Sequence, residues 1–300
     1  MDTITVEIQE TKVIGLREKL AAYFELTKPR IAFMLVLTSA AGFYLGSENG
    51  FNFVLFLNAM IGITILAFGV ATLNQYIERR TDALMDRTAN RPLPTQKITP
   101  NEALAFGILQ SLVAELYLLF LVNGITAAMG LIVIVGYVLL YTPLKTKTSA
   151  STAIGAIPGA MPPLMGWTSA SNEMTLGAAV LFLMLFLWQF PHFLAIAWMY
   201  REQYAKAGIL MLPVVEEEGK ITARQIVIFT VFLLPISLVP YFIGISGVVY
   251  LIGASILGIW FLWSSIKTAR AKSTEQARKL LLVSVLYLPL LFALMVFNHL

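Results

Sequence analysis

Long apolar runs recur along the whole chain, and they constrain its fold more than any other feature. Mostly apolar stretches follow one another from about residue 30 to residue 297, and about 20 such residues span a bilayer as an α-helix. Inside lipid, only helices and closed barrels satisfy the backbone polar groups. Because 58% of the residues are hydrophobic and only 13% are charged, we predict an all-α, polytopic membrane protein.

The turn and charge signals between these runs divide the chain into a tail and about nine spans. Residues 1–25 form a polar N-terminal tail, in which Leu16, Leu20 and Phe24 have the spacing of a short amphipathic helix on the membrane surface. Residues 26–300 form the membrane domain. The spans are expected at about 30–46, 52–78, 101–122, 125–142, 151–169, 176–200, 222–243, 248–266 and 279–297.

The positive charges predict how the spans are oriented. All 21 Lys and Arg residues fall in the tail or in the loops after the second, fourth, sixth and eighth spans. By the positive-inside rule, the N-terminus is cytoplasmic and the C-terminus lies outside, in a bacterial-type cell membrane. This distribution explains the basic charge without any nucleic-acid partner. The absence of cysteine excludes disulfides and thiolate chemistry.

The most charged stretch runs from residue 74 to residue 94, directly after the second apolar run. Asn74, Glu78, Asp82 and Asp86 recur every four residues, so neighbouring members would share one face of a helix. Carboxylates stacked in this way repel one another, and a bound cation would remove the repulsion. An amide and carboxylates are oxygen ligands suited to Mg²⁺, which often shares its coordination with substrate phosphates.

Two arginines extend the same pattern towards phosphate binding. Arg87 and Arg91 follow the acidic residues, and guanidinium groups bind phosphate in a bidentate manner. Together the two sets predict a Mg²⁺–diphosphate site at the cytoplasmic end of the second span. The alternative is a solvated cap on a membrane helix, because alternating charges usually mark a surface.

The motif Asn74-x-x-x-Glu78-x-x-x-Asp82-x-x-x-Asp86, followed by Arg87 and Arg91, resembles the first signature of the UbiA-type intramembrane prenyltransferases. Further similar segments cover residues 26–30, 141–145 and 155–159. The resemblance implies a helical enzyme that binds a prenyl diphosphate with Mg²⁺ in a central cavity, which opens to the cytoplasm. It assigns metal binding and catalysis to Asn74, Glu78, Asp82 and Asp86, and diphosphate binding to Arg87, Arg91, Lys145 and Tyr141.

A second group of residues resembles the branch of this family that acts on haem. The segment Trp188-Gln189-Phe190-Pro191-His192-Phe193 stands where quinone-type members approach a second acidic motif. This branch implies haem contacts from Trp188, Gln189, His192, Arg201 and Tyr204. Aromatic rings and imidazole suit a porphyrin, although a buried histidine held by packing is the alternative for His192.

The reaction implied by the resemblance is transfer of a farnesyl group from farnesyl diphosphate to the 2-vinyl group of haem B, with addition of water, to give haem O. The resemblance also implies association with a haem-A-forming enzyme or a terminal oxidase. Two alternatives stay open. A prenyltransferase for a quinone-precursor phenol or another lipid acceptor would need the second acidic motif. A transporter or haem carrier would account for the interrupted fifth span, which has three prolines and three glycines.

Overall fold

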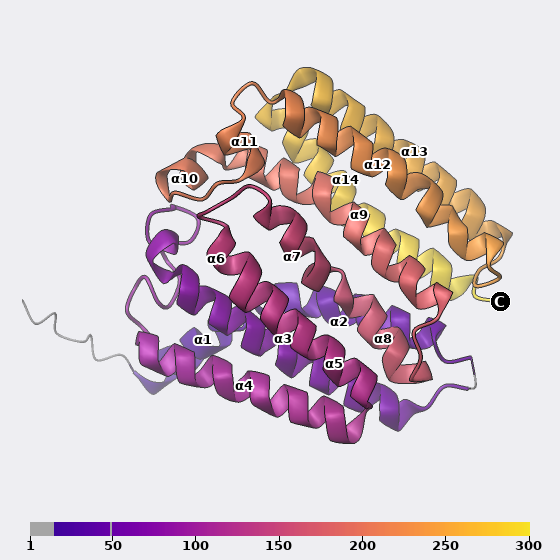
Figure 1. Ribbon diagram of the computed structural model, residues 1–300, viewed down its shortest axis with the longest axis horizontal. Coiled ribbons are helices and arrows are strands. Elements are labelled where there is room, and N and C mark those ends of the chain that lie inside the picture. The colour runs from indigo at the N-terminus through magenta and orange to yellow at the C-terminus, as the bar shows by residue number, and fades with distance from the viewer. Residues whose placement is uncertain (1–14, 49) are drawn as a thin grey trace, which may run out of the picture.

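The computed structural model describes residues 15–48 and 50–300, so the expectations for residues 1–14 lie outside the described part of the chain. In that part every named element is a helix (Figure 1), which confirms the all-α prediction. The elements are α1 (Leu16–Leu26), α2 (Pro29–Leu45), α3 (Phe53–Asp82), α4 (Pro100–Leu121), α5 (Gly124–Val133), the π-helix η1 (Ile134–Tyr141), α6 (Thr142–Leu144), α7 (Ser151–Gly159), α8 (Met161–Ser171), α9 (Leu176–Met199), α10 (Arg201–Lys206), α11 (Leu212–Val215), α12 (Lys220–Phe242), α13 (Val248–Ala271) and α14 (Thr274–Phe297).

The apolar helices match the nine predicted spans. Seven stretches of the described chain are long and apolar enough to cross a membrane, namely α3, α4, the run from α5 to α6, α9, α12, α13 and α14. The other two units are α2, a shorter apolar helix, and the pair α7–α8, which is interrupted at Ala160. The largest differences from prediction are five residues, where α13 ends at 271 against 266 and α14 begins at 274 against 279.

Short polar signals in the sequence set where these helices begin. At the start of α4, Thr99 accepts a hydrogen bond from the backbone N–H of Glu102, and the Glu102 carboxylate accepts one from the Thr99 N–H. This reciprocal pair is a capping box, and Pro100 adds a fixed φ at the first helical position. Asn123 caps α5 by accepting from the Thr126 N–H at 2.8 Å.

The interrupted pair α7–α8 packs against α2 at very short range. A Cβ atom on Gly166 of α8 would lie 1.9 Å from the Ser39 carbonyl oxygen, and one on Gly42 of α2 would lie 2.1 Å from the Pro163 carbonyl oxygen. Only glycine fits at either position. The Ser39 hydroxyl donates to the Pro162 carbonyl at 2.9 Å, so the irregular backbone at membrane depth is satisfied by its neighbour.

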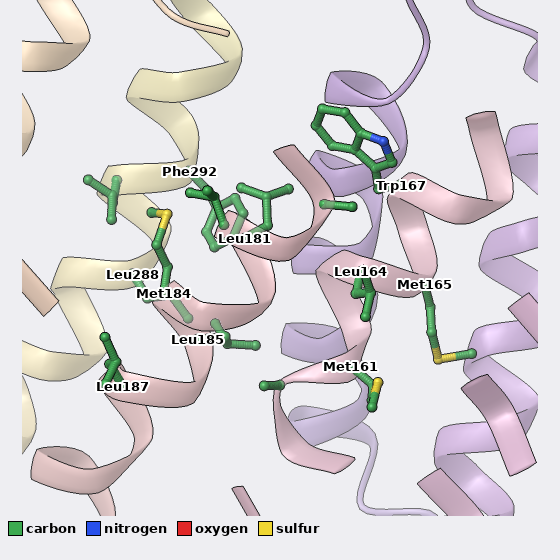
Figure 2. Close-up of a cluster of buried hydrophobic side chains, with 14 of the residues drawn as sticks. Met161, Leu164, Met165, Trp167, Leu181, Met184, Leu185, Leu187, Leu288 and Phe292 are labelled. Carbon is green, nitrogen blue, oxygen red and sulfur yellow. The ribbon is translucent and has the colours of Figure 1, made fainter. Parts of the chain in front are cut away.

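Figure 2 shows the part of the main apolar core where α9 packs against α8 and against α14. Met161, Leu164 and Trp167 of α8 project towards one side of the cluster, and Met184 of α9 and Phe292 of α14 contribute from the other. All five side chains are buried. This core joins the N-terminal half of the helices to the C-terminal half, and the charged residues lie at the ends of the bundle.

One end of the bundle carries α1, α10 and α11, which lie outside the apolar spans, together with α6, the last part of the α5–α6 span. There α1, α6, α10 and α11 gather at the left of Figure 1. The 30 residues of α3 extend about 45 Å at 1.5 Å per residue, whereas the hydrocarbon core is about 30 Å thick. Therefore α3 delivers its polar C-terminal turns to this end, which we call the site end.

The N-terminal helix α1 also lies at the site end. Its Ala22 and Leu26 are buried against the loop after α3, whereas Leu16, Leu20 and Phe24 stay exposed. The predicted helical spacing is thus present in the described residues. Contact between this exposed face and the membrane surface stays a prediction.

Candidate active site

The last three turns of α3 present three of the predicted metal ligands at the site end. Asn74, Glu78 and Asp82 follow each other at four-residue intervals up to the last residue of the helix. Asn74 and Asp82 are each only 1% exposed, and the Glu78 side chain is 11% exposed. Buried carboxylates are stable only with counter-charges or hydrogen bonds, so their partners decide what this site can bind.

Each of these three side chains contacts a different cation. The Lys28 ammonium donates to Oδ1 of Asn74 at 2.6 Å. Lys145 Nζ lies 2.6 Å from Glu78 Oε1, and Arg91 Nη1 lies 2.7 Å from Asp82 Oδ2. Two of the cations come from distant segments, before α2 and after α6, because the bundle brings these helix ends together.

Asp86 does not continue the helical face, so that part of the sequence expectation is wrong. The helix α3 ends at Asp82, and Asp86 is an exposed residue in the turns that follow. These turns reverse the chain, because the Thr88 hydroxyl donates to the Asp82 carbonyl at 2.8 Å and the Arg91 N–H donates to the Thr88 carbonyl at 3.0 Å. The reversal is what returns Arg91 to Asp82.

Arg87 is held by the short helix α10 and by the residue just before it. Its guanidinium donates to the Tyr204 hydroxyl at 3.2 Å and lies 5.0 Å from the centre of the Tyr200 ring. Gln203 joins the same contact, since it accepts from the Arg87 backbone N–H and donates to Asp86, both at 3.5 Å. Tyr200 and Tyr204 occupy the region where quinone-type enzymes carry acids, and here they face a cation.

The predicted diphosphate residue Tyr141 lies next to Lys145 at the end of the π-helix η1. Lys145 Nζ is 4.5 Å from the centre of the Tyr141 ring, and Tyr137 packs edge-on against Tyr141 at 4.9 Å. Asn74 donates from Nδ2 to the Thr142 hydroxyl at 3.0 Å. The wide turns of a π-helix are common at functional sites, and here they bring Tyr141 and Thr142 to the end of α3.

The pKa values of the two buried lysines are shifted in opposite directions. Burial lowers the pKa of Lys28 to about 7, and repulsion from Arg91 acts in the same direction. Burial alone would also lower the pKa of Lys145, but Glu78 holds that pKa well above the ordinary lysine value. An incoming anion would therefore favour the charged form of Lys28, whereas Lys145 is charged already.

The donor set suits Mg²⁺ in its chemistry, but the acidic groups do not form a ready-made cage. In residues 15–48 and 50–300, no three His, Cys, Asp or Glu side chains are placed together to hold a metal ion. Asn74, Glu78 and Asp82 offer hard oxygen atoms, each already in contact with a cation. Magnesium commonly takes one or two carboxylates plus phosphate oxygens, and this arrangement fits that mode of binding.

The predicted haem residues are divided between two places. Trp188 and His192 face α14, where the Trp188 indole N–H donates to the Ser284 carbonyl at 2.9 Å and His192 Nδ1 lies 2.8 Å from the Ser284 hydroxyl. The two rings stack with centroids 4.5 Å apart. Within the described part of the chain, His192 Nε2 has no hydrogen-bond partner, so this nitrogen is the one left for a ligand.

Gln189, Arg201 and Tyr204 do not join this pair. Gln189 is buried against α7 and donates to the Ala156 carbonyl at 3.1 Å. Arg201 lies 5.7 Å from the Trp198 ring, and Tyr204 belongs to the Arg87 contact at the site end. The residues predicted to bind the diphosphate thus gather at the site end. The residues predicted to contact haem are spread along α9 and α10.

Lys28 and Gln203 are the site residues that sequence reasoning missed. Lys28 has a left-handed backbone (φ 49°) directly before Pro29, a conformation in which few residues other than glycine are found. A lysine at the first turn of an apolar span is a signal that could have been used. Gln203 carried no such signal, because only the approach of α10 to the 83–98 turns gives it partners.

Comparison with known families identifies relatives over nearly the whole chain. The model of the UbiA prenyltransferase family matches residues 35–295. The chain is 46% identical over 286 residues to the protoheme IX farnesyltransferase of Solibacter usitatus. The aligned region covers 92% of this chain and 98% of that protein. It is 42% identical to the protoheme IX farnesyltransferase of Koribacter versatilis, with 95% of each chain covered.

Solved membrane enzymes share the fold. A digeranylgeranylglyceryl phosphate synthase structure superposes with a TM-score of 0.80 at 20% identity, covering 94% of this chain and 98% of that one. A UbiA homolog from Archaeoglobus fulgidus bound to GPP and Mg²⁺ gives a TM-score of 0.66 at 16% identity, covering 91% and 99%. At such identities the likeness concerns the fold alone.

Proposed function

This chain belongs to the UbiA prenyltransferase family, and on that premise we propose that it transfers a farnesyl group from farnesyl diphosphate to the 2-vinyl group of haem B, giving haem O. The observation that carries the proposal is the 46% identity to a protoheme IX farnesyltransferase across 92% of the chain. The charged cluster at the end of α3 supports it with groups suited to a diphosphate.

The site residues divide the work on the diphosphate. Arg87, Arg91, Lys28 and Lys145 supply four cations around the carboxylates, and guanidinium and ammonium groups stabilise a diphosphate as its charge grows. Asn74, Glu78 and Asp82 are the residues at the end of α3 that would hold Mg²⁺, and Asp86 stays a metal-ligand proposal from the family resemblance. When bound, the metal neutralises the diphosphate and makes it a better leaving group.

The bonds broken and formed in this reaction balance, and the attack on C1 needs no general base. The C1–O bond of farnesyl diphosphate breaks and its electron pair leaves with the diphosphate. The π electrons of the haem vinyl group form the new bond to C1. Water then adds to the carbon next to the porphyrin ring and releases one proton. Farnesyl diphosphate, haem B and water thus give haem O, diphosphate and a proton.

For haem we propose contact with His192 through Nε2 and with the stacked Trp188, supported by the free ring nitrogen and the exposed Phe193 beside it. Gln189, Arg201 and Tyr204 stay haem proposals from the family resemblance. A haem-A-forming enzyme or a terminal oxidase is the proposed partner class, since either would take the product onward.

The deciding experiment incubates the purified full-length protein with haem B, farnesyl diphosphate and Mg²⁺ and resolves the pigments by mass. We expect a haem product heavier by one farnesyl group and one hydroxyl group. A parallel reaction offers a quinone-precursor phenol in place of haem. Prenylated phenol with unchanged haem would replace the proposal with the phenol-acceptor activity, and bound but unmodified haem would favour a carrier.

A further inference from the structure

A second polar feature of the site end lies far from the α3 cluster, in a groove between α13 and α14. The groove has a volume of about 230 Å³. From α13 it is lined by Trp260, Trp263, Ser264 and Lys267, which recur every three or four residues along one face of the helix. From α14 it is lined by Gln276, Lys279 and Val283, also on one face.

The lining changes from charged to apolar with depth. At 1.5 Å per residue, Lys267 lies about 6 Å before the end of α13, and Lys279 lies about 7.5 Å after the start of α14. Because the two helices are antiparallel neighbours, both ammonium groups reach the same level. Trp260 and Val283 lie several ångströms deeper, where the groove is apolar.

The charges around the groove favour an anion. Lys267 Nζ lies 4.0 Å from the centre of the Trp263 ring, so its position is fixed by a contact with the groove wall. Glu275 is the only acidic residue in the segment 260–283, and it pairs with Lys279 at 2.7 Å on the exposed helix surface. Arg270, Lys272 and Arg278 lie in the same helix ends but do not line the groove, and the Lys272 ammonium donates to the Glu218 carbonyl at 3.1 Å.

We propose that this groove binds the headgroup of an anionic phospholipid, with its phosphate between Lys267 and Lys279 and an acyl chain along Trp260 and Val283. Basic pockets between membrane helices on the cytoplasmic side suit anionic headgroups, and tryptophan favours the level of the headgroups. A single amphiphile satisfies both halves of the groove, whereas a free phosphate would leave the apolar half empty.

Another groove of the same bundle gives a contrast. Between the α5–η1 run and α7 lies an outward-facing groove of about 410 Å³, lined by apolar residues such as Leu131, Val135 and Ile157 together with Gly136 and Pro158. It offers a lipid chain a surface but no group for a headgroup charge. We therefore expect the α13–α14 groove, and not this apolar groove, to bind anionic lipid selectively.

The test uses tryptophan fluorescence of the full-length protein in phosphatidylcholine nanodiscs. A small fraction of the lipid carries a brominated acyl chain on either phosphatidylglycerol or phosphatidylcholine. Trp260 and Trp263 are 39% and 56% exposed, so bromine in the groove quenches them. We expect stronger quenching by brominated phosphatidylglycerol, and about a fivefold loss of that preference for each of the changes Lys267→Gln and Lys279→Gln.

A matched control removes the same two charges elsewhere at the site end. Lys147→Gln combined with Lys220→Gln changes exposed lysines outside the groove and should keep the preference. Equal quenching by the two lipids in the parent, or a loss of the preference in the control as large as in the groove variants, would overturn the proposal. Full competition by millimolar inorganic phosphate would assign the lysines to a free-anion site and exclude the lipid.

Discussion

Asp82 is the carboxylate whose removal tests the metal proposal most directly, because it is buried and contacts a single cation, Arg91. We expect Asp82→Asn to lower haem O formation by at least about 100-fold, since charge stabilisation by a metal is worth several kcal/mol. Chelation of Mg²⁺ should abolish activity in the parent, and added Mg²⁺ should restore it.

The matched control for Asp82→Asn is Glu102→Gln. Glu102 also pairs with a cation at the site end, Lys19, but it caps α4 away from the α3 cluster. It should keep near-parent turnover with a small loss of thermal stability. Full activity in excess chelator would rule out the metal-dependent mechanism.

Substitution of Lys145 tests whether the protein's own cations neutralise the carboxylates of the ligand-free site. The Lys145 ammonium pairs with the Glu78 carboxylate at 2.6 Å. A metal ion must therefore compete with Lys145 for Glu78 until the diphosphate binds the ammonium instead. Lys145→Met should weaken farnesyl diphosphate binding by about tenfold, the value of one charge-assisted hydrogen bond, and should tighten binding of Mn²⁺ alone. Electron paramagnetic resonance of free and bound Mn²⁺ measures the second effect, and weaker or unchanged Mn²⁺ binding would contradict it.

His192 and Ser284 separate haem contact from packing. His192→Ala removes the imidazole, whereas Ser284→Ala removes only its 2.8 Å hydrogen bond. If Nε2 contacts haem, His192→Ala should change the absorption spectrum of bound haem or weaken its binding, and Ser284→Ala should keep most of both. Titration of each variant with haem B checks this. Equal losses in the two variants, with farnesyl diphosphate binding reduced as well, would indicate a packing role.

At the scale of elements, the α2–α8 crossing is the contact least able to adapt. Gly166→Ala puts a Cβ atom 1.9 Å from the Ser39 carbonyl oxygen, and both are backbone-fixed. We expect a loss of about 2–3 kcal/mol, as for other overpacked sites, seen as a lower unfolding temperature in detergent. Gly136→Ala is the control, because its nearest neighbour would be 3.4 Å away, and it should change stability much less.

The elements themselves were largely predictable, and their irregularities were not. The lengths of the apolar runs predicted the nine spans to within five residues. The π-helix before Tyr141 and the exit of Asp86 from the α3 face could not be read from spacing, because both depend on packing against other segments. The same holds for Lys28, whose partner Asn74 lies 46 residues away.

For the whole molecule, the charge distribution predicts one orientation in the membrane. The sequence has no cysteine, so single cysteines report on accessibility without background. Thr146→Cys lies in an exposed loop at the site end, and Glu173→Cys lies in an exposed loop at the opposite end. In intact cells a membrane-impermeant thiol reagent should label Glu173→Cys and spare Thr146→Cys until the cells are opened. The reverse pattern would invert the topology.

The pairing of Glu78 with Lys145 also has a consequence for how the chain is made. The two residues are 67 positions apart, so α3 enters the membrane before its counter-ion has been synthesised. Until the fourth span follows, Glu78 lacks the ammonium group that lies 2.6 Å from it, and Lys28 and Arg91 are the cations that favour its charged form. Completion of the charged cluster thus reports that the first four spans have assembled. A chain that stops before residue 145 would therefore lack the direct ion pair at Glu78 and leave this part of the cluster incomplete.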